Sequence, residues 1–199
     1  MHLILSFLLI ATCSGFGQTP SEALQRLVDG NLRYAQDKPL QADHSADRRK
    51  ALLQGQAPFA IIVGCSDSRV TPEIIFDQGV GDLFVVRIAG NVVGPIELDS
   101  IGFSAKVLGS SVILILGHES CGAVKAVLEK NTADIEQVAA LIQSAIQTTD
   151  LETAVKANVQ YVVANLKESS QLKRLIEEDK LKCVGAYYNI KSGQIELLK

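Results

Sequence analysis

A chain of 199 residues is long enough for one domain with a substantial hydrophobic core. Hydrophobic residues make up 47% of the chain, an ordinary globular composition that excludes a disordered or fibrous protein. The formal net charge of -3 provides no basic excess, so the sequence argues against nucleic-acid binding and against electrostatic attraction to an anionic membrane.

An apolar run at residues 3–11 is far shorter than the about 20 residues that a transmembrane helix needs. A run of this length predicts the central part of a signal peptide, with cleavage before Gln18. The segment lacks Lys and Arg, and two alternatives stay open: lipidation at Cys13, or a cytoplasmic protein whose N-terminus is disordered or docks on the core. We therefore expect a signal peptide over 1–17, one domain over 18–199, and a periplasmic or secreted protein without a transmembrane span.

Helix and strand signals alternate along the rest of the chain. A Thr-Pro-Ser-Glu start and helically spaced leucines predict an amphipathic N-terminal arm over 20–36, which can pack on its own domain or on a second subunit. Further helices are expected over 46–54, 72–76, 95–108, 122–129, 132–148, 151–167 and 170–179. Strands are expected over 59–63, 83–88, 112–116 and 181–189, with a terminal hairpin strand over 194–198. This order is typical of a single α/β domain with a mainly parallel sheet flanked by helices.

Residues with chemically active side chains follow two of the predicted strands. The first strand ends in Gly-Cys-Ser-Asp-Ser-Arg, which contains Cys65, Asp67 and Arg69. The third strand is apolar throughout and ends in a turn that holds His118 and Cys121. Because the C-terminal ends of parallel strands meet at one edge of a sheet, we expect these five side chains to lie close together.

Two thiols and one imidazole form a ligand set that suits zinc. The His-x-x-Cys spacing lets His118 and Cys121 face one centre, and Cys65 adds a third ligand. Three protein ligands are typical of a catalytic zinc site, in which water takes the fourth position. A disulfide between the two cysteines, or a core histidine bonded to backbone, remains an alternative. The odd number of cysteines left without Cys13 argues against a disulfide framework, and we expect Cys183 to lie in the core.

Asp67 and Arg69 stand two residues apart beside the expected metal. A carboxylate there can accept a hydrogen bond from a metal-bound hydroxide and orient it. A guanidinium can hold that carboxylate ionised through a fork of two charge-assisted hydrogen bonds. The alternative is an ion pair that only shapes the turn.

The motif Cys-Ser-Asp-Ser-Arg, followed by His-x-x-Cys-Gly after an apolar strand, resembles the β-class carbonic anhydrases. The similarity runs from about residue 56 to 124 and includes Phe-Val-Val-Arg at 84–87 and Ala-Gly-Asn at 89–91. The resemblance implies a β-carbonic-anhydrase-like fold and assembly as a homodimer or a multiple of dimers. It also implies reversible hydration of carbon dioxide to bicarbonate and a proton through a zinc-bound hydroxide, with one Zn2+ per subunit.

The same resemblance implies a role for each residue of the two motifs. Cys65, His118 and Cys121 would bind zinc. Asp67 and Arg69 would form the catalytic dyad, and Asp67 could serve as a fourth metal ligand in a closed, inactive state.

Three further residues would contact substrate according to the resemblance: Gln56, Phe84 and Gly122. Two departures from the family pattern, Phe103 in place of Tyr and Ala89 in place of a larger aliphatic residue, leave the size and polarity of the pocket open. A carbonyl sulfide or carbon disulfide hydrolase on the same scaffold is therefore an alternative. A non-catalytic zinc-stabilised binding domain and a redox protein that uses the two motif cysteines are the others.

Overall fold

The computed structural model describes residues 18–40 and 42–199, so the predicted signal peptide and Cys13 lie outside the described residues. Five strands form one sheet in the order β2-β1-β3-β4-β5. The first four strands run parallel, and the last is antiparallel to β4, which confirms the mainly parallel sheet. Their bounds are β1 (Ala60–Gly64), β2 (Leu83–Arg87), β3 (Val112–His118), β4 (Lys182–Tyr188) and β5 (Ile195–Leu198).

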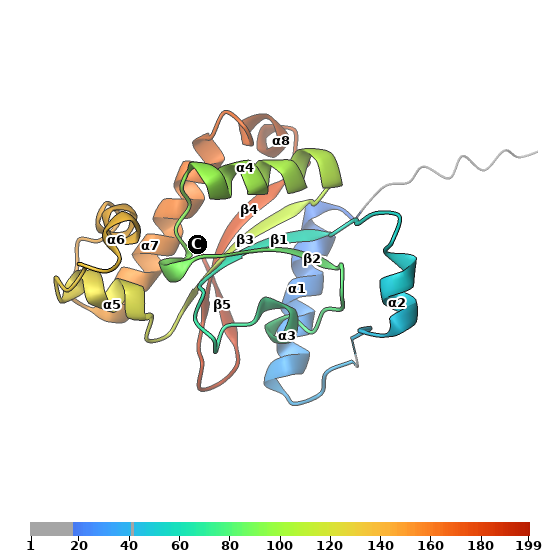
Figure 1. Ribbon diagram of the computed structural model, residues 1–199, viewed down its shortest axis with the longest axis horizontal. Coiled ribbons are helices and arrows are strands. Elements are labelled where there is room, and N and C mark those ends of the chain that lie inside the picture. Colours follow the sequence, from blue (N-terminus) through green and yellow to red (C-terminus); the bar gives the residue numbers. More distant parts are fainter. Residues whose placement is uncertain (1–17, 41) are drawn as a thin grey trace, which may run out of the picture.

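Helices cover both faces of the sheet. Figure 1 shows α1 and α3 on one face and α4 and α7 on the other, with α5 and α6 beyond one end of the strands. The helices are α1 (Pro20–Ala35), α2 (Ala46–Ala51), α3 (Pro72–Ile75), α4 (Pro95–Phe103), α5 (Gly122–Leu128), α6 (Glu136–Gln143), α7 (Leu151–Glu168) and α8 (Lys173–Glu177). A 3-10 turn, η1 (Ala89–Asn91), follows β2, and a π turn, η2 (Ser104–Leu108), follows α4.

Four predicted helices differ from those in the structure, two of them only in length: those expected over 46–54 and 170–179 are the shorter α2 and α8. The helix expected over 132–148 is the shorter α6, because a turn precedes it and the polar residues after it cap the next helix. There the Asp150 carboxylate accepts a hydrogen bond from the backbone N–H of Thr153 at the start of α7. The helix expected over 95–108 ends in the π turn, where Ser104 and Ser110 share a hydroxyl hydrogen bond of 2.9 Å.

The N-terminal helix α1 packs on its own domain. Thr19 and Glu22 form a reciprocal capping box at its start. Its buried face places Leu27 in the core, and the Asn31 side chain donates a 2.8 Å hydrogen bond to the carbonyl of Gly193. The first helix is therefore attached both to the core and to the last turn of the chain, and it covers this face of the sheet.

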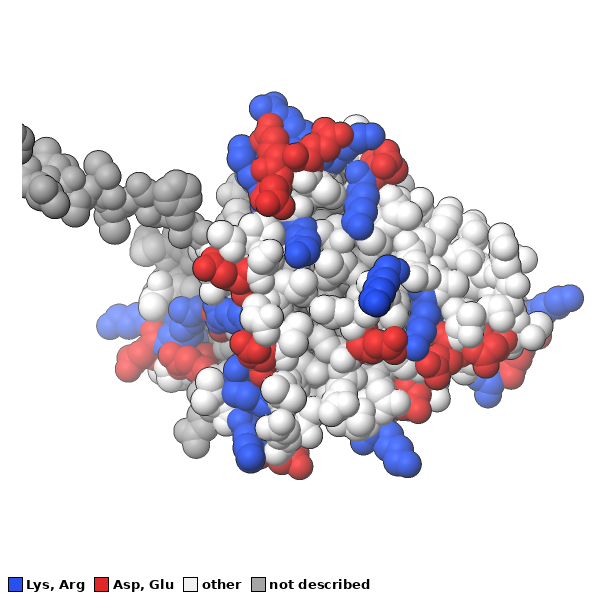
Figure 2. All heavy atoms as spheres, turned by 180° about the vertical axis from the view of Figure 1, so that it is seen from behind, with Lys and Arg blue, Asp and Glu red and all other residues white. Residues whose placement is uncertain are grey.

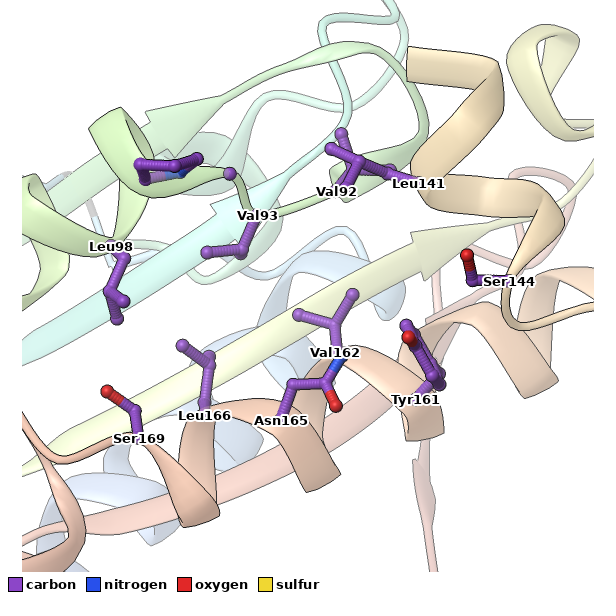
Figure 3. A pocket seen from close by; sticks show the side chains of 12 residues that line it. Val92, Val93, Leu98, Leu141, Ser144, Tyr161, Val162, Asn165, Leu166 and Ser169 are labelled. Carbon is purple, nitrogen blue, oxygen red and sulfur yellow. The ribbon is translucent and has the colours of Figure 1, made fainter. Parts of the chain in front are cut away.

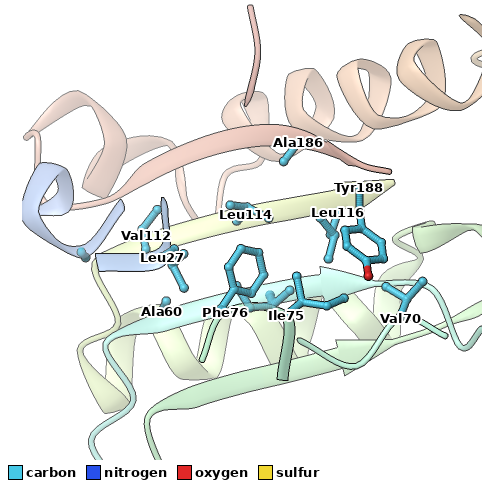
Figure 4. Close-up of a cluster of buried hydrophobic side chains, with 12 residues drawn as sticks. Leu27, Ala60, Val70, Ile75, Phe76, Val112, Leu114, Leu116, Ala186 and Tyr188 are labelled. Carbon is cyan, nitrogen blue, oxygen red and sulfur yellow. The ribbon is translucent and has the colours of Figure 1, made fainter. Parts of the chain in front are cut away.

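The core lies on both faces of the sheet because the central strands β1 and β3 are buried throughout. Figure 4 shows side chains of α1, β1, β3 and β4 meeting around Phe76. On the other face, α7 lies very close to the strands. A Cβ atom added at Gly117 in β3 or at Gly185 in β4 would lie 2.6 Å from a methyl group of Val159. The two glycines thus let α7 rest directly on the strand that ends in His118.

Acidic and basic side chains are intermixed on the face seen in Figure 2. Ion pairs between described residues include those of Lys156 with Glu152 and Glu196 at 2.9 and 2.8 Å. This face therefore carries no extended basic stripe among the described residues. Across the described ranges, no helix combines the length and the apolar character needed to span a bilayer.

Candidate metal centre

Cys65, His118 and Cys121 meet at the carboxyl edge of the sheet, as the sequence predicts. Their ligand atoms all lie within 4.8 Å of one another, and all three residues are buried. The parallel pairing of β1 with β3 explains the meeting, because Gly64 at the end of β1 lies beside Leu116 of β3. Neighbouring strands therefore deliver one thiol from the first motif and two ligands from the second.

The turn between His118 and Cys121 directs both side chains to one point. Ser120 adopts a left-handed backbone conformation with φ of 55°, which turns the chain sharply between them. The Nδ1 atom of His118 lies 2.9 Å from the carbonyl oxygen of Glu119 and donates a hydrogen bond to it. This bond fixes the tautomer that leaves a lone pair on Nε2.

These residues fit a zinc ion. Within the described chain, the buried Nε2 atom of His118 has no hydrogen-bond partner, which is costly unless a ligand satisfies it. Two sulfurs and one imidazole nitrogen are ligands that zinc prefers. Over the described residues, Cys65, Cys121 and Cys183 are free thiols, so the two motif cysteines are available as ligands.

The two motif thiols influence each other's ionisation. The pKa of Cys65 is lowered, chiefly because the Cys121 thiol donates a hydrogen bond to its thiolate. The backbone N–H of Gly90 adds a second donor, 3.3 Å from the Cys65 sulfur. The pKa of Cys121 is raised because it shares its proton with Cys65 and is buried. The pair therefore holds one proton more readily than two, and metal binding by thiolates releases the protons that remain.

Asp67 and Arg69 form the predicted fork beside the ligands. The Nε atom of Arg69 donates to Oδ1 of Asp67 at 2.9 Å, and a terminal nitrogen donates to Oδ2 at 2.7 Å. This fork holds the pKa of Asp67 well below its usual range, so the carboxylate is ionised. Oδ2 also lies 3.9 Å from Nε2 of His118, which places the carboxylate at the metal centre.

Arg87 supports the loop that carries both Cys65 and Asp67. Its Nε atom donates to the Cys65 carbonyl at 3.1 Å, and a terminal nitrogen donates to the Asp67 carbonyl at 2.7 Å. No role for Arg87 was predicted from the sequence, although an arginine at the end of an otherwise apolar strand is unusual.

The structure brings only one of the three predicted substrate contacts to the metal centre of the same chain. Gly122 opens α5 directly after Cys121, and no described atom lies within 4 Å of a Cβ added there. Gln56 is exposed in the segment before β1, at the opposite end of that strand from Cys65. Phe84 is the second residue of β2 and packs partly buried on the α4 and α7 face. All three substrate contacts stay predictions.

A separate apolar cavity of about 320 Å³ lies between α4, α6 and α7. Figure 3 shows its lining, with Val92 and Leu141 at one end and Leu166 and Ser169 at the other. Val92 also belongs to the buried cluster that contains both motif cysteines. The cavity therefore shares Val92 with that cluster, and its lining offers only apolar and neutral groups.

Replacing Gly90 by Ala is expected to destabilise the fold, because this residue has φ of 69° and approaches its neighbours closely. The added Cβ would lie 2.7 Å from Cδ1 of Ile142. We expect a loss of about 1–3 kcal/mol in the free energy of unfolding, measured by urea denaturation. The matched control is Gly122→Ala, which meets open space and should cause no loss. Equal stability of the two variants would contradict the assigned role of Gly90.

Comparison with known proteins connects this centre to one family. The family model described as carbonic anhydrase matches residues 60–195. A carbonic anhydrase of Mycolicibacterium smegmatis is 50% identical over 109 residues, which cover 55% of this chain and 53% of that protein. The match thus spans about half the length of this relative. A carbonic anhydrase of Pseudomonas aeruginosa is 32% identical over 197 residues, covering 88% of this chain and 87% of the relative.

Solved structures agree with the sequence matches. The β-carbonic anhydrase CcaA superposes with a TM-score of 0.68 at 27% identity, covering 88% of this chain and 95% of that one. The β-carbonic anhydrase CafA of Aspergillus fumigatus has a TM-score of 0.66 at 26% identity, with 90% of each chain covered. The fold, the cysteine–histidine cluster and these matches together place the chain in the β-carbonic anhydrase family.

Proposed function

We propose that this protein catalyses the reversible hydration of carbon dioxide to bicarbonate and a proton, with one zinc ion per subunit held by Cys65, His118 and Cys121. The observation that carries the proposal is the convergence of these three ligands with the ionised Asp67–Arg69 fork. Membership of the family supports the same reaction.

Hydration of carbon dioxide requires hydroxide, which is scarce at neutral pH. Zinc, when bound, lowers the pKa of a coordinated water so that hydroxide becomes available near neutral pH. The thiolates of Cys65 and Cys121 offset the formal charge of Zn2+. Neighbouring groups of the protein must therefore favour and orient the nucleophile.

We assign that task to Asp67 because one of its oxygens keeps a free lone pair. Oδ1 accepts two bonds from Arg69, one from the side chain and one from the backbone N–H at 2.9 Å. Oδ2 accepts one bond from Arg69 and is the oxygen 3.9 Å from Nε2 of His118. A carboxylate oxygen can accept two hydrogen bonds, so Oδ2 can still accept one from a nucleophile at the centre.

The surroundings of the centre favour these polar contacts. The three ligands are buried, and the Asp67 side chain retains only 17% of its exposed surface, whereas that of Arg69 retains 50%. Charge-assisted hydrogen bonds are stronger where water is largely excluded. Arg69 thus remains hydrated on its outer side while its fork keeps the carboxylate aimed inward.

A substrate comparison separates this function from hydrolysis of carbonyl sulfide or carbon disulfide. One zinc-loaded preparation should be assayed for carbon dioxide hydration by stopped flow and for sulfide release from the other two substrates. We expect the carbon dioxide reaction to have by far the highest kcat/KM. Faster sulfide release than hydration would reassign the substrate, and background rates with all three would favour a non-catalytic zinc domain.

We further propose that the chain works as a homodimer or a multiple of dimers. Support comes from exposed apolar side chains on α4 and η2, among them Ile96, Phe103 and Val107, and from the edge position of β2. The distance of Gln56 from the metal centre of its own chain also favours a partner that supplies this contact. Sedimentation velocity should give a dimer or larger species at micromolar concentration, and a monomer would contradict the proposal.

Export is a proposal that rests on the apolar run at residues 3–11. N-terminal sequencing of the protein from fractionated cells tests it. Processing before Gln18 in a periplasmic or secreted fraction is the expected result. A lipid on Cys13 would show that the protein is exported but anchored to a membrane. An intact Met1 in the cytoplasm would contradict export.

A further inference from the structure

A buried amide on α7 reaches the loop that contacts the metal centre. The Asn158 side chain is completely buried, and its Nδ2 atom donates a 2.8 Å hydrogen bond to the carbonyl oxygen of Gly90. Its neighbours along the buried stripe of α7 are apolar, including Val155 and Val162. Burying an amide among apolar groups costs free energy, which its hydrogen bond offsets only in part. The presence of an asparagine at this position therefore needs an explanation.

The Oδ1 atom of Asn158 gives a first indication of its role. Among the described residues this buried oxygen has no hydrogen-bond partner. An asparagine that served only to stabilise the core would be expected to pair both of its polar atoms. The side-chain hydrogen bond that Asn158 makes to another described residue is therefore the one from Nδ2 to the Gly90 carbonyl.

Gly90 also forms a hydrogen bond with Cys65, one of the proposed metal ligands. Its backbone N–H donates to the Cys65 sulfur at 3.3 Å, while its carbonyl accepts the bond from Asn158. The left-handed conformation of Gly90, with φ of 69°, allows the residue to make both contacts. Asn158, Gly90 and Cys65 therefore form one chain of hydrogen bonds that leads from α7 to the thiolate.

The helix that carries Asn158 is fixed to the strand that carries another ligand. Val159, the next residue on α7, rests on Gly117 of β3, and His118 follows at the end of that strand. The position of Asn158 relative to His118 is thus set by close packing. Through Gly90, the amide is connected by hydrogen bonds to the Cys65 sulfur.

We propose that Asn158 is a positioning residue for the metal centre, which holds the Cys65 thiolate in place through the Gly90 backbone. This inference rests on the zinc binding proposed above but not on the reaction. Removing the amide donor should free Gly90 to shift and weaken its bond to the sulfur. Loss of a group that hydrogen-bonds directly to a ligand weakens metal binding by about 10- to 100-fold in known sites, so the lower end of that range is expected for Asn158, which acts through Gly90.

The test compares Asn158→Leu, which keeps the branched shape without the donor, with the wild type. We expect zinc affinity, measured by competition with a chelator, to fall about 10-fold. In the cobalt-substituted protein, the thiolate-to-cobalt absorption band should shift to lower energy because the sulfur loses a hydrogen bond. Asn158→Ala is measured alongside, because it removes the donor without adding volume.

The matched control is Val162→Ala, one turn along the same buried stripe. This variant should lower the melting temperature but leave zinc affinity and the cobalt spectrum unchanged. Wild-type affinity and spectrum in both Asn158 variants would overturn the inference. A wild-type protein without a thiolate-to-cobalt band would instead contradict the zinc site itself, so the two failures can be told apart.

Discussion

Replacing Asp67 by Asn is expected to lower the rate of carbon dioxide hydration by about 10²- to 10³-fold while zinc content stays at one per chain. The amide has nearly the shape of the carboxylate but no charge, so it cannot form the fork with Arg69. Its NH2 group would also place a donor where the centre needs an acceptor. Stopped-flow hydration assays and metal analysis on the same sample measure both quantities.

Two companion variants define the cause of that loss. Arg69→Lys keeps the positive charge but cannot form two parallel bonds, so its rate should lie between those of wild type and Asp67→Asn. The exposed Asp47→Asn substitution on α2 is the matched control and should leave the rate unchanged. A wild-type rate in Asp67→Asn would reduce the Asp67–Arg69 pair to an ion pair that only shapes the turn.

Replacing Cys121 by Ser is expected to abolish both stoichiometric zinc binding and hydration. Serine is a poor replacement for a thiolate because its hydroxyl stays protonated near neutral pH. Added zinc should raise the melting temperature of the wild type by mass action and leave this variant unchanged. Elemental analysis and thermal unfolding measure the two effects.

Cys183→Ala is the matched control for that experiment. Cys183 is also buried, in β4, and burial raises its pKa to about 12. Because it lies in the core away from the ligand cluster, its replacement should retain zinc and activity at a modest cost in stability. Zinc loss in this control, or zinc retention in Cys121→Ser, would contradict the ligand assignment.

The sequence was sufficient to predict the parallel sheet and the cluster of Cys65, His118 and Cys121 at the candidate metal centre, because both depend on local patterns. Apolar runs mark β1 and β3, and each run ends directly in the residues that form the centre, including Cys65 and His118. The mainly parallel order then requires these ends to meet at one edge. Cys183 lies in the core, as its apolar neighbours predict.

Features that depend on contacts between distant segments were not predictable in the same way. Arg87 could be recognised as unusual in a strand, but its two bonds to the ligand loop depend on the pairing of β2 with β1. Asn158 interrupts an apolar stripe on α7, and only the close approach of that helix to the sheet brings it to Gly90. The helical spacing of the sequence shows that a polar residue lies on a buried face. It does not show which group this residue contacts.

The substrate contacts illustrate the same limit. Gly122 adjoins a metal ligand in sequence, so its place at the centre follows directly. Gln56 and Phe84 were assigned through resemblance to a family, and within one chain neither lies with the metal ligands. No local pattern in the sequence shows where either residue lies relative to the ligand cluster.

The most direct measurement is a titration of metal-free wild-type protein with zinc, in which carbon dioxide hydration is followed by stopped flow after each addition. We predict that the rate rises in proportion to bound zinc and reaches a plateau at one equivalent per chain. A protein that binds one equivalent of zinc and still hydrates carbon dioxide no faster than buffer would contradict the proposed function.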